Sequence, residues 1–282
     1  MEAVRPEWNS RVNYPEWHVI LKRVMFLPPG FQKALAVEAA DLALQSYAQY
    51  DAFTKGQPWA IAGNYQVLGL LQARPQEISF VTEPFGFVVR NLDSQNVFVA
   101  LRGTNSFLDW VADFSFPQVP HPWGAVERGF NFIYAQCTDS VRAAVARAPG
   151  APVFVTGHSL GAALAVLAAA DIAMAGTTPQ MYSFCGPRAG STGFTGQFNQ
   201  KIAAWRVVNT EDVVPTLPLA TATLGAPSGI QETAVNRVLE FLSQLDYEHV
   251  GNAVTFTVQR GSIAGNHDLQ LCRDMVNAAA QG

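Results

Sequence analysis

The sequence predicts an α/β protein in which a mostly parallel central sheet is covered by helices on both faces. Short apolar runs alternate with helix-forming segments along most of the chain, and several of these runs end in polar loops. Strands that alternate with helices form parallel sheets, because each helix carries the chain back across the sheet. No internal repeat or low-complexity linker interrupts the pattern, so we expect one domain spanning residues 1–282.

The N-terminal part of the chain predicts one helix followed by three strands. After an irregular, aromatic-rich start, residues 32–50 combine strong helix formers with amphipathic spacing. Three β-rich runs follow at residues 77–82, 85–91 and 96–103, and the polar segment 91–96 forms the predicted turn between the last two.

The remainder of the chain predicts a regular alternation of helices and strands. The predicted helices are residues 128–149, the Ala/Leu-rich segment 160–173 and residues 268–279. The predicted strands are residues 152–157, 180–186, 204–209 and 254–261. In parallel sheets, binding sites gather in the loops beyond the carboxyl ends of the strands, so the polar residues at those ends are the candidate functional residues.

The charge content argues against a nucleic-acid partner. Charged residues make up 14% of the chain and the net charge is −4, which leaves no basic patch for phosphate contacts. The low charge content suits an enzyme that works at an apolar interface. A compact enzyme with long buried elements would show the same composition.

The cysteines predict neither a disulfide framework nor a metal site. Cys137, Cys185 and Cys272 are widely spaced and odd in number, and they form no zinc-binding pattern. We expect them to behave as small buried apolar groups, with a single bridge as the alternative.

The sequence predicts no transmembrane segment and no signal peptide. The longest apolar run, residues 160–170, is far shorter than the roughly 18 residues that a membrane span requires. The first twenty residues lack a continuous apolar stretch and a small-residue cleavage signature. We therefore expect either a cytoplasmic protein or the mature form of a secreted one.

The segment GHSLG, residues 157–161, predicts a nucleophilic serine. It follows an apolar strand directly and opens a helix, which is the context that a nucleophile elbow requires. Gly157 and Gly161 lack a Cβ atom, so the turn can be tight and the helix can pack close to the strand. This turn would lift the Ser159 hydroxyl above the sheet. The alternative is a glycine-rich turn that contains an incidental serine.

A serine nucleophile needs a histidine base, and two histidines follow Ser159 at a useful distance. His267 lies in a glycine-rich loop between the last predicted strand and the last helix, where a base could reach the elbow. His249 lies before that strand, where we expect an orienting or surface role. We therefore predict His267 as the base, against the alternative of an exposed loop histidine or a helix cap.

The acid that orients the base is predicted to be Asp212, which follows the end of the strand 204–209. Its neighbour Glu211 would point elsewhere in an extended backbone. Asp171 falls within a helix and Asp246 within a polar stretch, so both are poorer candidates. Asp268 adjoins the proposed base but is expected to cap the last helix.

Acyl transfer also requires donors for the developing oxyanion. The backbone N–H of Leu160, directly after the nucleophile, is one expected donor. The second should come from a loop after an earlier strand, where the sequence offers Gly103 and Thr104. An ordinary turn residue remains the alternative for Thr104.

With these residues in view, the sequence resembles the class 3 lipases, the fungal-lipase-like branch of the α/β-hydrolases. The resemblance spans approximately residues 30–280 and rests on five motifs in the same order. These are LRGTNSFLDWVADF as oxyanion strand and lid, the elbow GHSLG, the segment FCGPRAG, the acid segment VVNTEDVVPTLP, and NHDL at the catalytic histidine. The resemblance implies the α/β-hydrolase fold with a short helical lid.

The resemblance also implies roles for individual residues. Ser159 would be the nucleophile, His267 the general base and then acid, and Asp212 the orienting carboxylate. Thr104 would offer both its backbone N–H and its hydroxyl to the oxyanion, together with the N–H of Leu160.

Further along the oxyanion segment, Asp113 would hold the Thr104 hydroxyl in place. Residues 105–116 would form the lid, with apolar side chains that become buried in lipid when it opens: Phe107, Leu108, Trp110 and Val111. A core-facing helix is the alternative for this segment.

The chain departs from the family pattern at three points. Arg128 stands where the family often has a histidine, and Leu271 and Cys272 stand near the place of a frequent tyrosine. We expect packing differences at both positions. Three cysteines cannot reproduce the disulfides of the secreted fungal members.

Together these features predict a serine carboxylic ester hydrolase, specifically a triacylglycerol lipase that acts at lipid–water interfaces through an acyl-enzyme on Ser159. The expected partners are a lipid ester substrate and a transient lipid interface, with no obligatory protein partner. No metal and no cofactor are expected, because acylation of the serine and deacylation by water complete the cycle. A phospholipase A1 or a feruloyl-type esterase is the alternative within the same class, and a non-catalytic lipid-binding relative is the alternative outside it.

Overall fold

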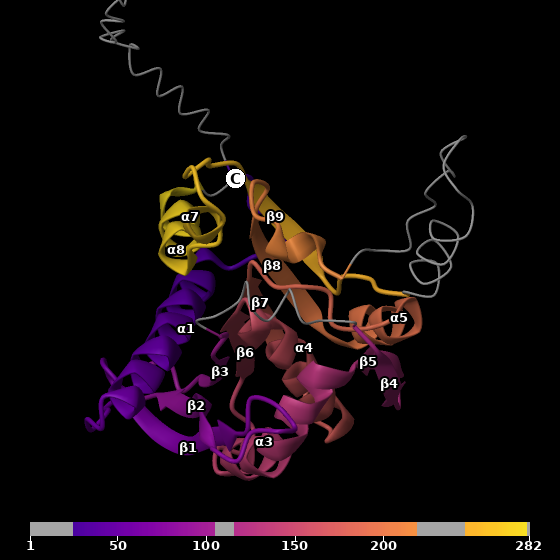
Figure 1. Ribbon diagram of the computed structural model, residues 1–282. Coiled ribbons are helices and arrows are strands. Elements are labelled where there is room, and N and C mark those ends of the chain that lie inside the picture. The colour runs from indigo at the N-terminus through magenta and orange to yellow at the C-terminus, as the bar shows by residue number, and fades with distance from the viewer. Residues whose placement is uncertain (1–24, 105–115, 219–245, 281–282) are drawn as a thin grey trace, which may run out of the picture.

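A computed structural model describes residues 25–104, 116–218 and 246–280, and its described part is built around a seven-stranded sheet (Figure 1). The strand order is β1-β2-β3-β6-β7-β8-β9. The first two ladders, β1 with β2 and β2 with β3, are antiparallel, and the other four are parallel. The strands are β1 Tyr65–Ala73, β2 Glu83–Asn91, β3 Val97–Leu101, β6 Val153–His158, β7 Gln180–Phe184, β8 Ala203–Asn209 and β9 Asn252–Phe256.

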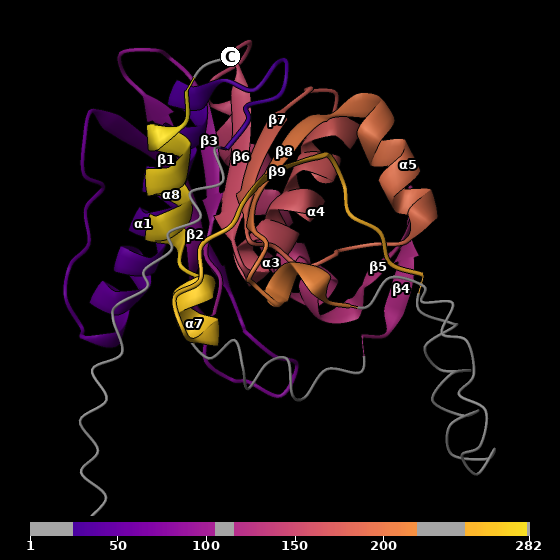
Figure 2. The same cartoon turned by 90° about the horizontal axis from the view of Figure 1, so that it is seen from above.

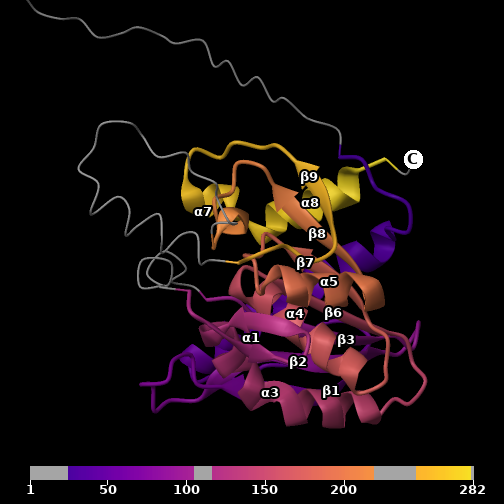
Figure 3. The same cartoon turned by 90° about the vertical axis from the view of Figure 1, so that its right-hand side faces the viewer.

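Helices cover both faces of this sheet, so the predicted fold class is confirmed (Figure 2). On one face lie α1 Lys33–Thr54 and α8 Leu269–Ala278, which pack against each other. On the other face lie α3 Arg128–Ala146, α4 Leu160–Met174 and α5 Thr192–Lys201. A short helix, α7 Ile263–Asn266, precedes α8, and both follow β9 along the chain (Figure 3).

Each face of the sheet buries its own apolar cluster. The alternation along β3 divides its side chains between them, with Val97, Val99 and Leu101 in the cluster under α3 and α4. Phe98 and Ala100 belong to the cluster under α1 and α8. This period of two is the normal consequence of side chains that point alternately to opposite faces of a strand.

The helix that follows the elbow is apolar on all sides because it is buried on all sides. Every residue of α4 from Leu160 to Ile172 is buried. Asp171, the one charged residue among them, accepts hydrogen bonds from Tyr134 and from the guanidinium of Arg142. Within the described ranges, no helix combines the length and the apolar composition that a membrane crossing needs.

The predicted strand at residues 77–82 is wrong. These residues form the loop between β1 and β2, and Ile78 and Phe80 in it are 80% and 97% exposed. The reason is tertiary, because Ala73 of β1 already pairs with Glu83 of β2, which leaves the residues between them without a strand to pair with. The edge strand β1, whose side chains are only partly buried, was not predicted.

Five other elements of the described residues were not predicted from the sequence. They are the two strands of a hairpin, β4 Gln118–His121 and β5 Gly124–Glu127, helix α5, helix α7 and the 3-10 turn η1 Val214–Thr216. All are short or lack strong periodicity, which leaves little local signal to detect. The other predicted helices and strands are confirmed, although the last strand ends at Phe256 rather than at residue 261.

The turn from β6 into α4 depends on two glycines. A Cβ atom on Gly157 would lie 2.1 Å from the carbonyl oxygen of Gly161, within the turn itself. A Cβ atom on Gly161 would lie 2.3 Å from the carbonyl oxygen of Leu101 at the end of β3. Neither contact is sterically possible, so α4 can pack this close to β6 and β3 only because both side chains are absent.

We predict that Gly161→Ala lowers the free energy of unfolding by about 3 kcal/mol, because the added methyl group meets backbone and not a movable side chain. Urea unfolding followed by circular dichroism measures the effect. Gly196→Ala is the matched control, since Gly196 lies in α5 with open space around it. That variant should gain about 0.5–1 kcal/mol from the helix propensity of alanine. Equal stability of the two variants would contradict the packing argument.

Candidate active site

Ser159 occupies a strained position between the end of β6 and the start of α4. Its φ is 60° and its ψ is −132°, a conformation that side chains with a Cβ atom rarely adopt. The backbone N–H of Ser159 donates to the carbonyl oxygen of Phe184 at the end of β7, at 3.1 Å. The side chain is buried, and its hydroxyl forms no hydrogen bond with any described residue. The turn therefore holds a serine hydroxyl at the carboxyl ends of the central strands.

The structure brings His267 and Asp212 together from two separate loops. His267 Nδ1 lies 2.7 Å from Asp212 Oδ2, although the residues are 55 positions apart. The second carboxylate oxygen of Asp212 accepts from the backbone N–H of Val214 at 3.0 Å, which fixes the orientation of the carboxylate. Because a carboxylate can only accept, Nδ1 carries the proton and Nε2 of the neutral ring is the basic nitrogen.

His158, the residue before Ser159, holds the backbone of His267. The two imidazole rings lie with their centroids 4.5 Å apart, and His158 Nε2 lies 3.1 Å from the carbonyl oxygen of His267. Burial lowers the pKa of His158 well below its ordinary value, and the nearby His267 ring lowers it further. His158 is therefore neutral, so Nε2 donates to the carbonyl and Nδ1 accepts from the Tyr47 hydroxyl at 2.9 Å.

Two asparagines connect the loop that carries Asp212 with the loop that carries His267. Asn209 donates through its side chain to the carbonyl oxygens of Val258 and Asn266, at 2.9 and 3.0 Å. The Asn266 amide donates in turn to the carbonyl oxygen of Glu211 at 3.0 Å. Both asparagines are buried, so these bonds are protected from competition with water.

Tyr47, His158, Asn209 and Asn266 were missed by the sequence analysis. The sequence offered one signal for the two asparagines, namely their position next to the predicted site residues. Asn209 ends a predicted strand close before Asp212, and Asn266 directly precedes His267. Tyr47 had none, since it lies 111 positions away from His158, its hydrogen-bond partner.

The residues expected to stabilise an oxyanion lie at the elbow. Leu160 is the first residue of α4, and Thr104 follows the end of β3. The end of β3 is in close contact with the elbow, since a Cβ atom on Gly103 would lie 2.7 Å from the carbonyl oxygen of His158. The other residues expected in this region lie outside the described residues: Phe107, Leu108, Trp110, Val111 and Asp113.

The alternative acids considered in the sequence have other partners. Asp268 caps the amino end of α8 by accepting from the backbone N–H of Gln270, as expected. Glu211 accepts from the side chain of Gln259, away from His267. Asp246 accepts from the backbone N–H and the hydroxyl of Thr192.

The alternative base, His249, lies under the segment that follows Asp212. Its Nε2 donates to the carbonyl oxygen of Pro215 at 2.7 Å. Burial, and to a smaller extent the charge of Arg206, lower the pKa of His249 to about 3. This histidine supports the turn η1, which agrees with an orienting role.

One group of potential metal ligands occurs among the described residues, at this same site. Single ligand atoms of Cys185, Asp212 and His267 all lie within 4.8 Å of one another. The Asp212–His267 hydrogen bond already uses two of these side chains, and the hydrogen bond that Cys185 shares with Cys272, together with burial, raises the pKa of the Cys185 thiol well above its ordinary value. A metal would have to break that bond and deprotonate a buried thiol, so the arrangement suits proton transfer better than metal binding.

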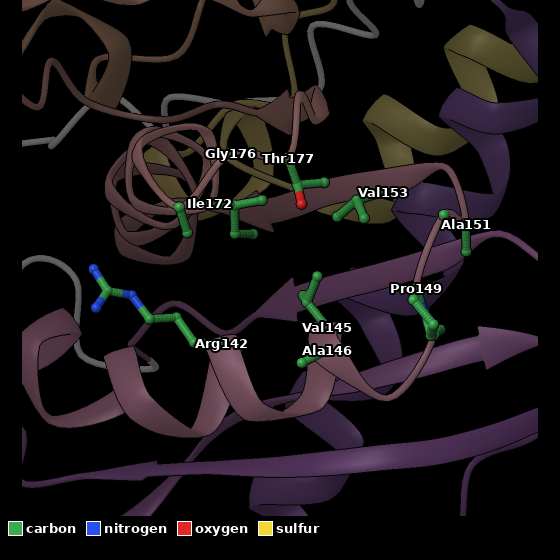
Figure 4. Close-up of a pocket in the computed structure, with 12 residues that line it drawn as sticks. Arg142, Val145, Ala146, Pro149, Ala151, Val153, Ile172, Gly176 and Thr177 are labelled. Atoms are coloured by element: carbon green, nitrogen blue, oxygen red, sulfur yellow. The ribbon is translucent and has the colours of Figure 1, made fainter.

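A groove of about 650 Å³ lies elsewhere on the protein, between the carboxyl ends of α3 and α4 (Figure 4). Arg142, Pro149, Val153 and Thr177 are among the residues that line it. Val153 begins β6 and Ser159 follows its end. This groove therefore lies at the amino ends of the parallel strands, whereas the site lies at their carboxyl ends. We assign it no part in the chemistry.

Two of the three departures from the family pattern are single sites, and they lie at different depths in the structure. Arg128 lies on the surface and forms a bidentate ion pair with Glu77, at 2.6 and 2.7 Å. Leu271 and Cys272 are buried in the cluster under α8.

Acid should destabilise the fold because His158 and His249 are held neutral. Below about pH 6.5 the unfolded chain binds a proton on each histidine, whereas folded His249 does so only near its pKa of about 3 and folded His158 well below 6.5. The unfolded state therefore gains up to about 1.4 kcal/mol per histidine for each pH unit below 6.5. Urea unfolding at pH 7, 6 and 5 measures this slope.

His249→Gln is the control for that slope. Glutamine can still donate to the Pro215 carbonyl but does not titrate, and all carboxylates are shared by the two proteins. The variant should lose less stability between pH 7 and 5 than the wild-type protein does. Equal losses would show that His249 is not held neutral in the folded state.

Comparison with known proteins shows which proteins this chain is similar to. Residues 98–222 match the family model described as lipase (class 3). The secreted mono- and diacylglycerol lipase A of Penicillium cyclopium is 32% identical over 150 residues, which cover 50% of this chain and 49% of that protein. A chloroplastic/mitochondrial phospholipase A1 of Oryza sativa subsp. indica is 28% identical over 233 residues, which cover 70% of this chain and 51% of that protein. The chain thus spans about half the length of these curated relatives.

Solved structures of similar proteins share the fold. The triacylglyceride lipase of Rhizomucor miehei has a TM-score of 0.57 at 24% identity, covering 67% of this chain and 76% of that chain. A mutant form of the Penicillium cyclopium enzyme has a TM-score of 0.59 at 23% identity, covering 81% of each chain. The chain thus shares the fold of these α/β-hydrolase lipases, and its residues 98–222, which include the elbow and Asp212, match the class 3 lipase model.

Proposed function

We propose that this protein is a serine carboxylic ester hydrolase, and specifically a triacylglycerol lipase that acts at lipid–water interfaces. The observation that carries the proposal is the hydrogen-bonded pair of His267 and Asp212, in which His267 contacts His158, the residue before the strained Ser159. A buried serine with a histidine whose tautomer is set by a carboxylate is the arrangement used for nucleophilic acyl transfer. The match of residues 98–222 to the class 3 lipase model supports the same chemistry.

The proposed reaction has two halves. Ser159 Oγ attacks the ester carbonyl carbon while His267 Nε2 takes its proton, and Asp212 stabilises the imidazolium that forms. The tetrahedral intermediate collapses to an acyl-enzyme, and His267 gives the proton to the leaving alcohol. Water then attacks the acyl group, His267 accepts its proton and returns it to Ser159, and the fatty acid leaves.

In both halves, negative charge develops on the carbonyl oxygen of the substrate. We assign its stabilisation to the backbone N–H of Leu160 at the start of α4 and to Thr104 after β3. The resemblance adds Asp113 as the residue that orients the Thr104 hydroxyl. No metal or cofactor takes part in this cycle, because the charge is stabilised by hydrogen-bond donors of the protein itself.

The surface around the site supports a lipid substrate. The loop between β1 and β2 lies on the same side of the sheet as the carboxyl end of β3, because β2 runs antiparallel to β3 and begins where β3 ends. Its side chains Ile78, Phe80 and Val81 are all exposed. Val213, next to Asp212, and Ile263, close before His267, are also exposed. We propose that these side chains enter the lipid surface, together with a lid at residues 105–116 that is assigned from the sequence resemblance alone.

Phospholipase A1 activity is the second candidate, and one observation favours it. The phospholipase A1 of Oryza sativa aligns with 70% of this chain, a longer stretch than the 50% that aligns with the Penicillium cyclopium lipase. Fatty-acid release from phosphatidylcholine in mixed micelles, compared with release from emulsified triacylglycerol, decides between the two substrates.

We predict that Ser159→Ala abolishes hydrolysis of both 4-nitrophenyl butyrate and 4-nitrophenyl palmitate. In subtilisin, loss of the serine nucleophile costs about a millionfold in rate, so only background hydrolysis should remain here. Initial rates of 4-nitrophenol release measure the loss. Ser140→Ala, which removes an exposed hydroxyl on α3, is the control and should retain full activity.

The outcomes of that experiment separate the possible functions. Hydrolysis of both esters by the wild-type protein supports a lipase, and hydrolysis of the butyrate alone indicates an esterase for short acyl chains. A Ser159→Ala variant as active as the wild-type protein would refute Ser159 as the nucleophile. A wild-type protein that binds liposomes without hydrolysing any ester would instead be a non-catalytic relative.

We predict that Phe80→Ser slows the hydrolysis of emulsified triacylglycerol but leaves the hydrolysis of dissolved 4-nitrophenyl butyrate within about twofold of wild type. Transfer of one phenylalanine side chain into lipid contributes about 2 kcal/mol, equivalent to about thirtyfold in adsorption. Leu92→Ser is the control, since Leu92 is an exposed apolar residue in the turn between β2 and β3. This turn lies at the amino end of β3, away from the site. Equal effects of the two variants on the emulsion would exclude the β1–β2 loop as a lipid contact.

A further inference from the structure

Two of the three cysteines lie in contact next to the candidate active site. Cys185 directly follows β7 and Cys272 lies in the first turns of α8, and both are fully buried. Their Sγ atoms are 3.3 Å apart, across a sequence separation of 87 residues. The structure holds them as two thiols that share a hydrogen bond.

This thiol pair connects the parts of the molecule that form the site. Phe184, the residue before Cys185, accepts the backbone hydrogen bond of Ser159. Cys272 follows His267 by five positions, within the helix that begins directly after it. The Cys185 Sγ also lies within 4.8 Å of ligand atoms of both Asp212 and His267. A covalent bond between the two thiols would therefore join the elbow side of the sheet to the histidine loop.

The backbone at Cys185 is strained. Its φ is 49°, in the left-handed region that favours glycine, and its N–H donates to the carbonyl oxygen of Val207. A side chain is thus held where a glycine would fit with less strain. That side chain is the thiol that contacts Cys272, so the strained position and the thiol pair coincide.

Cys137 provides an internal comparison, because it is buried without a second thiol. Its Sγ lies near the carbonyl oxygen of Gln72, at 3.7 Å, and it belongs to the cluster on the other face of the sheet. Burial raises the pKa of Cys137 to about 12. Burial of a cysteine in this protein therefore does not by itself produce a thiol pair.

We propose that Cys185 and Cys272 are a disulfide site, which closes into an intrachain bridge when the chain folds in the presence of a small-molecule disulfide. The Cys185 thiolate attacks the oxidant and forms a mixed disulfide, releasing one small-molecule thiol. The Cys272 thiolate then attacks the Cys185 sulfur, forms the bridge and releases the second small-molecule thiol. Two protein thiols lose two electrons and two protons, and one small-molecule disulfide is reduced to two thiols.

The burial of the pair determines when this exchange takes place. Both side chains are shielded from solvent in the folded state, and the hydrogen bond between them, together with burial, raises the pKa of the Cys185 thiol, which is therefore protonated and unreactive. An oxidant or reductant reaches them only before folding is complete or after α8 detaches. The redox state present during folding is therefore retained by the folded protein.

The bridge would stabilise the segment that carries the acid and the base. The loop it closes runs from Cys185 to Cys272 and includes both Asp212 and His267. Closing a loop of this length restricts the unfolded chain, which raises the stability of the folded state relative to it.

Refolding the denatured wild-type chain under two redox conditions tests the proposal. One sample refolds with oxidised glutathione and the other with reduced glutathione, and each is then denatured, alkylated with iodoacetamide and weighed by mass spectrometry. We expect one alkylated cysteine, Cys137, in the oxidised sample and three in the reduced sample. The oxidised protein should also melt about 5 °C or more above the reduced one.

Two variants identify the bonded pair. Cys137→Ser should still form the bridge, so it should carry no alkylated cysteine after oxidation and two after reduction. Cys272→Ser should form no bridge and show no difference in melting temperature between the two conditions. Three alkylated cysteines in the oxidised wild-type protein, a bridge that involves Cys137, or equal melting temperatures of the two forms would overturn the proposal.

The two main measurements, the count of free thiols and the melting temperature, do not depend on the proposed function. Thiol counting and melting temperature need no substrate, so they stand even if neither form hydrolyses an ester. If the protein is an ester hydrolase, the bridged form should keep its activity to a higher temperature of preincubation than the reduced form. Inactivation of both forms at the same temperature would separate the bridge from the stability of the site.

Discussion

The close approach of α4 to β6 and β3 is the constraint on which the rest of the site depends. Two glycines permit it, since side chains at Gly157 and Gly161 would collide with backbone carbonyl groups 2.1 and 2.3 Å away. This packing forces the intervening Ser159 into a conformation that is costly for any residue with a side chain. The burial of apolar side chains in α4 and the central strands offsets the free-energy cost of this strained backbone, since almost all of these side chains are removed from water. The core thus stabilises a turn that would not form in isolation.

Around this rigid turn, hydrogen bonds between loops position the acid and the base. Asn209 and Asn266 join the loops after β8 and β9, and the neutral His158 binds the backbone of His267 from the elbow side. Each of these polar groups is buried and paired, so a shift of one loop would leave donors and acceptors unsatisfied. The position of His267 is therefore determined by several elements at once: β6, β8 and, through Tyr47, α1.

The carboxyl and amino ends of the parallel strands carry different kinds of residues. At the carboxyl ends of the parallel strands lie the buried polar groups of the site and the exposed apolar side chains of the β1–β2 loop. At the amino end of β6 lies a groove beside Arg142, whose guanidinium pairs with Asp171 of α4. The thiol pair of Cys185 and Cys272 lies at the carboxyl ends, so a bond between these thiols would stabilise the site and not the groove at the amino ends.

The sequence by itself determined the fold class, the elbow and the identities of Ser159, Asp212 and His267 as candidates, because these signals are local. An apolar strand, a glycine-flanked serine and a helix follow one another directly, and the acid and the base stand just beyond strand ends. Only the tertiary structure decided that residues 77–82 are an exposed loop, since their apolar alternation suits a strand but no partner strand is available. It also decided that Tyr47 and His158 hold the histidine loop, and that Cys185 meets Cys272 while Cys137 stays apart. Such contacts join residues tens of positions or more apart, and the packing of the sheet and its helices, not local pattern, brings them together.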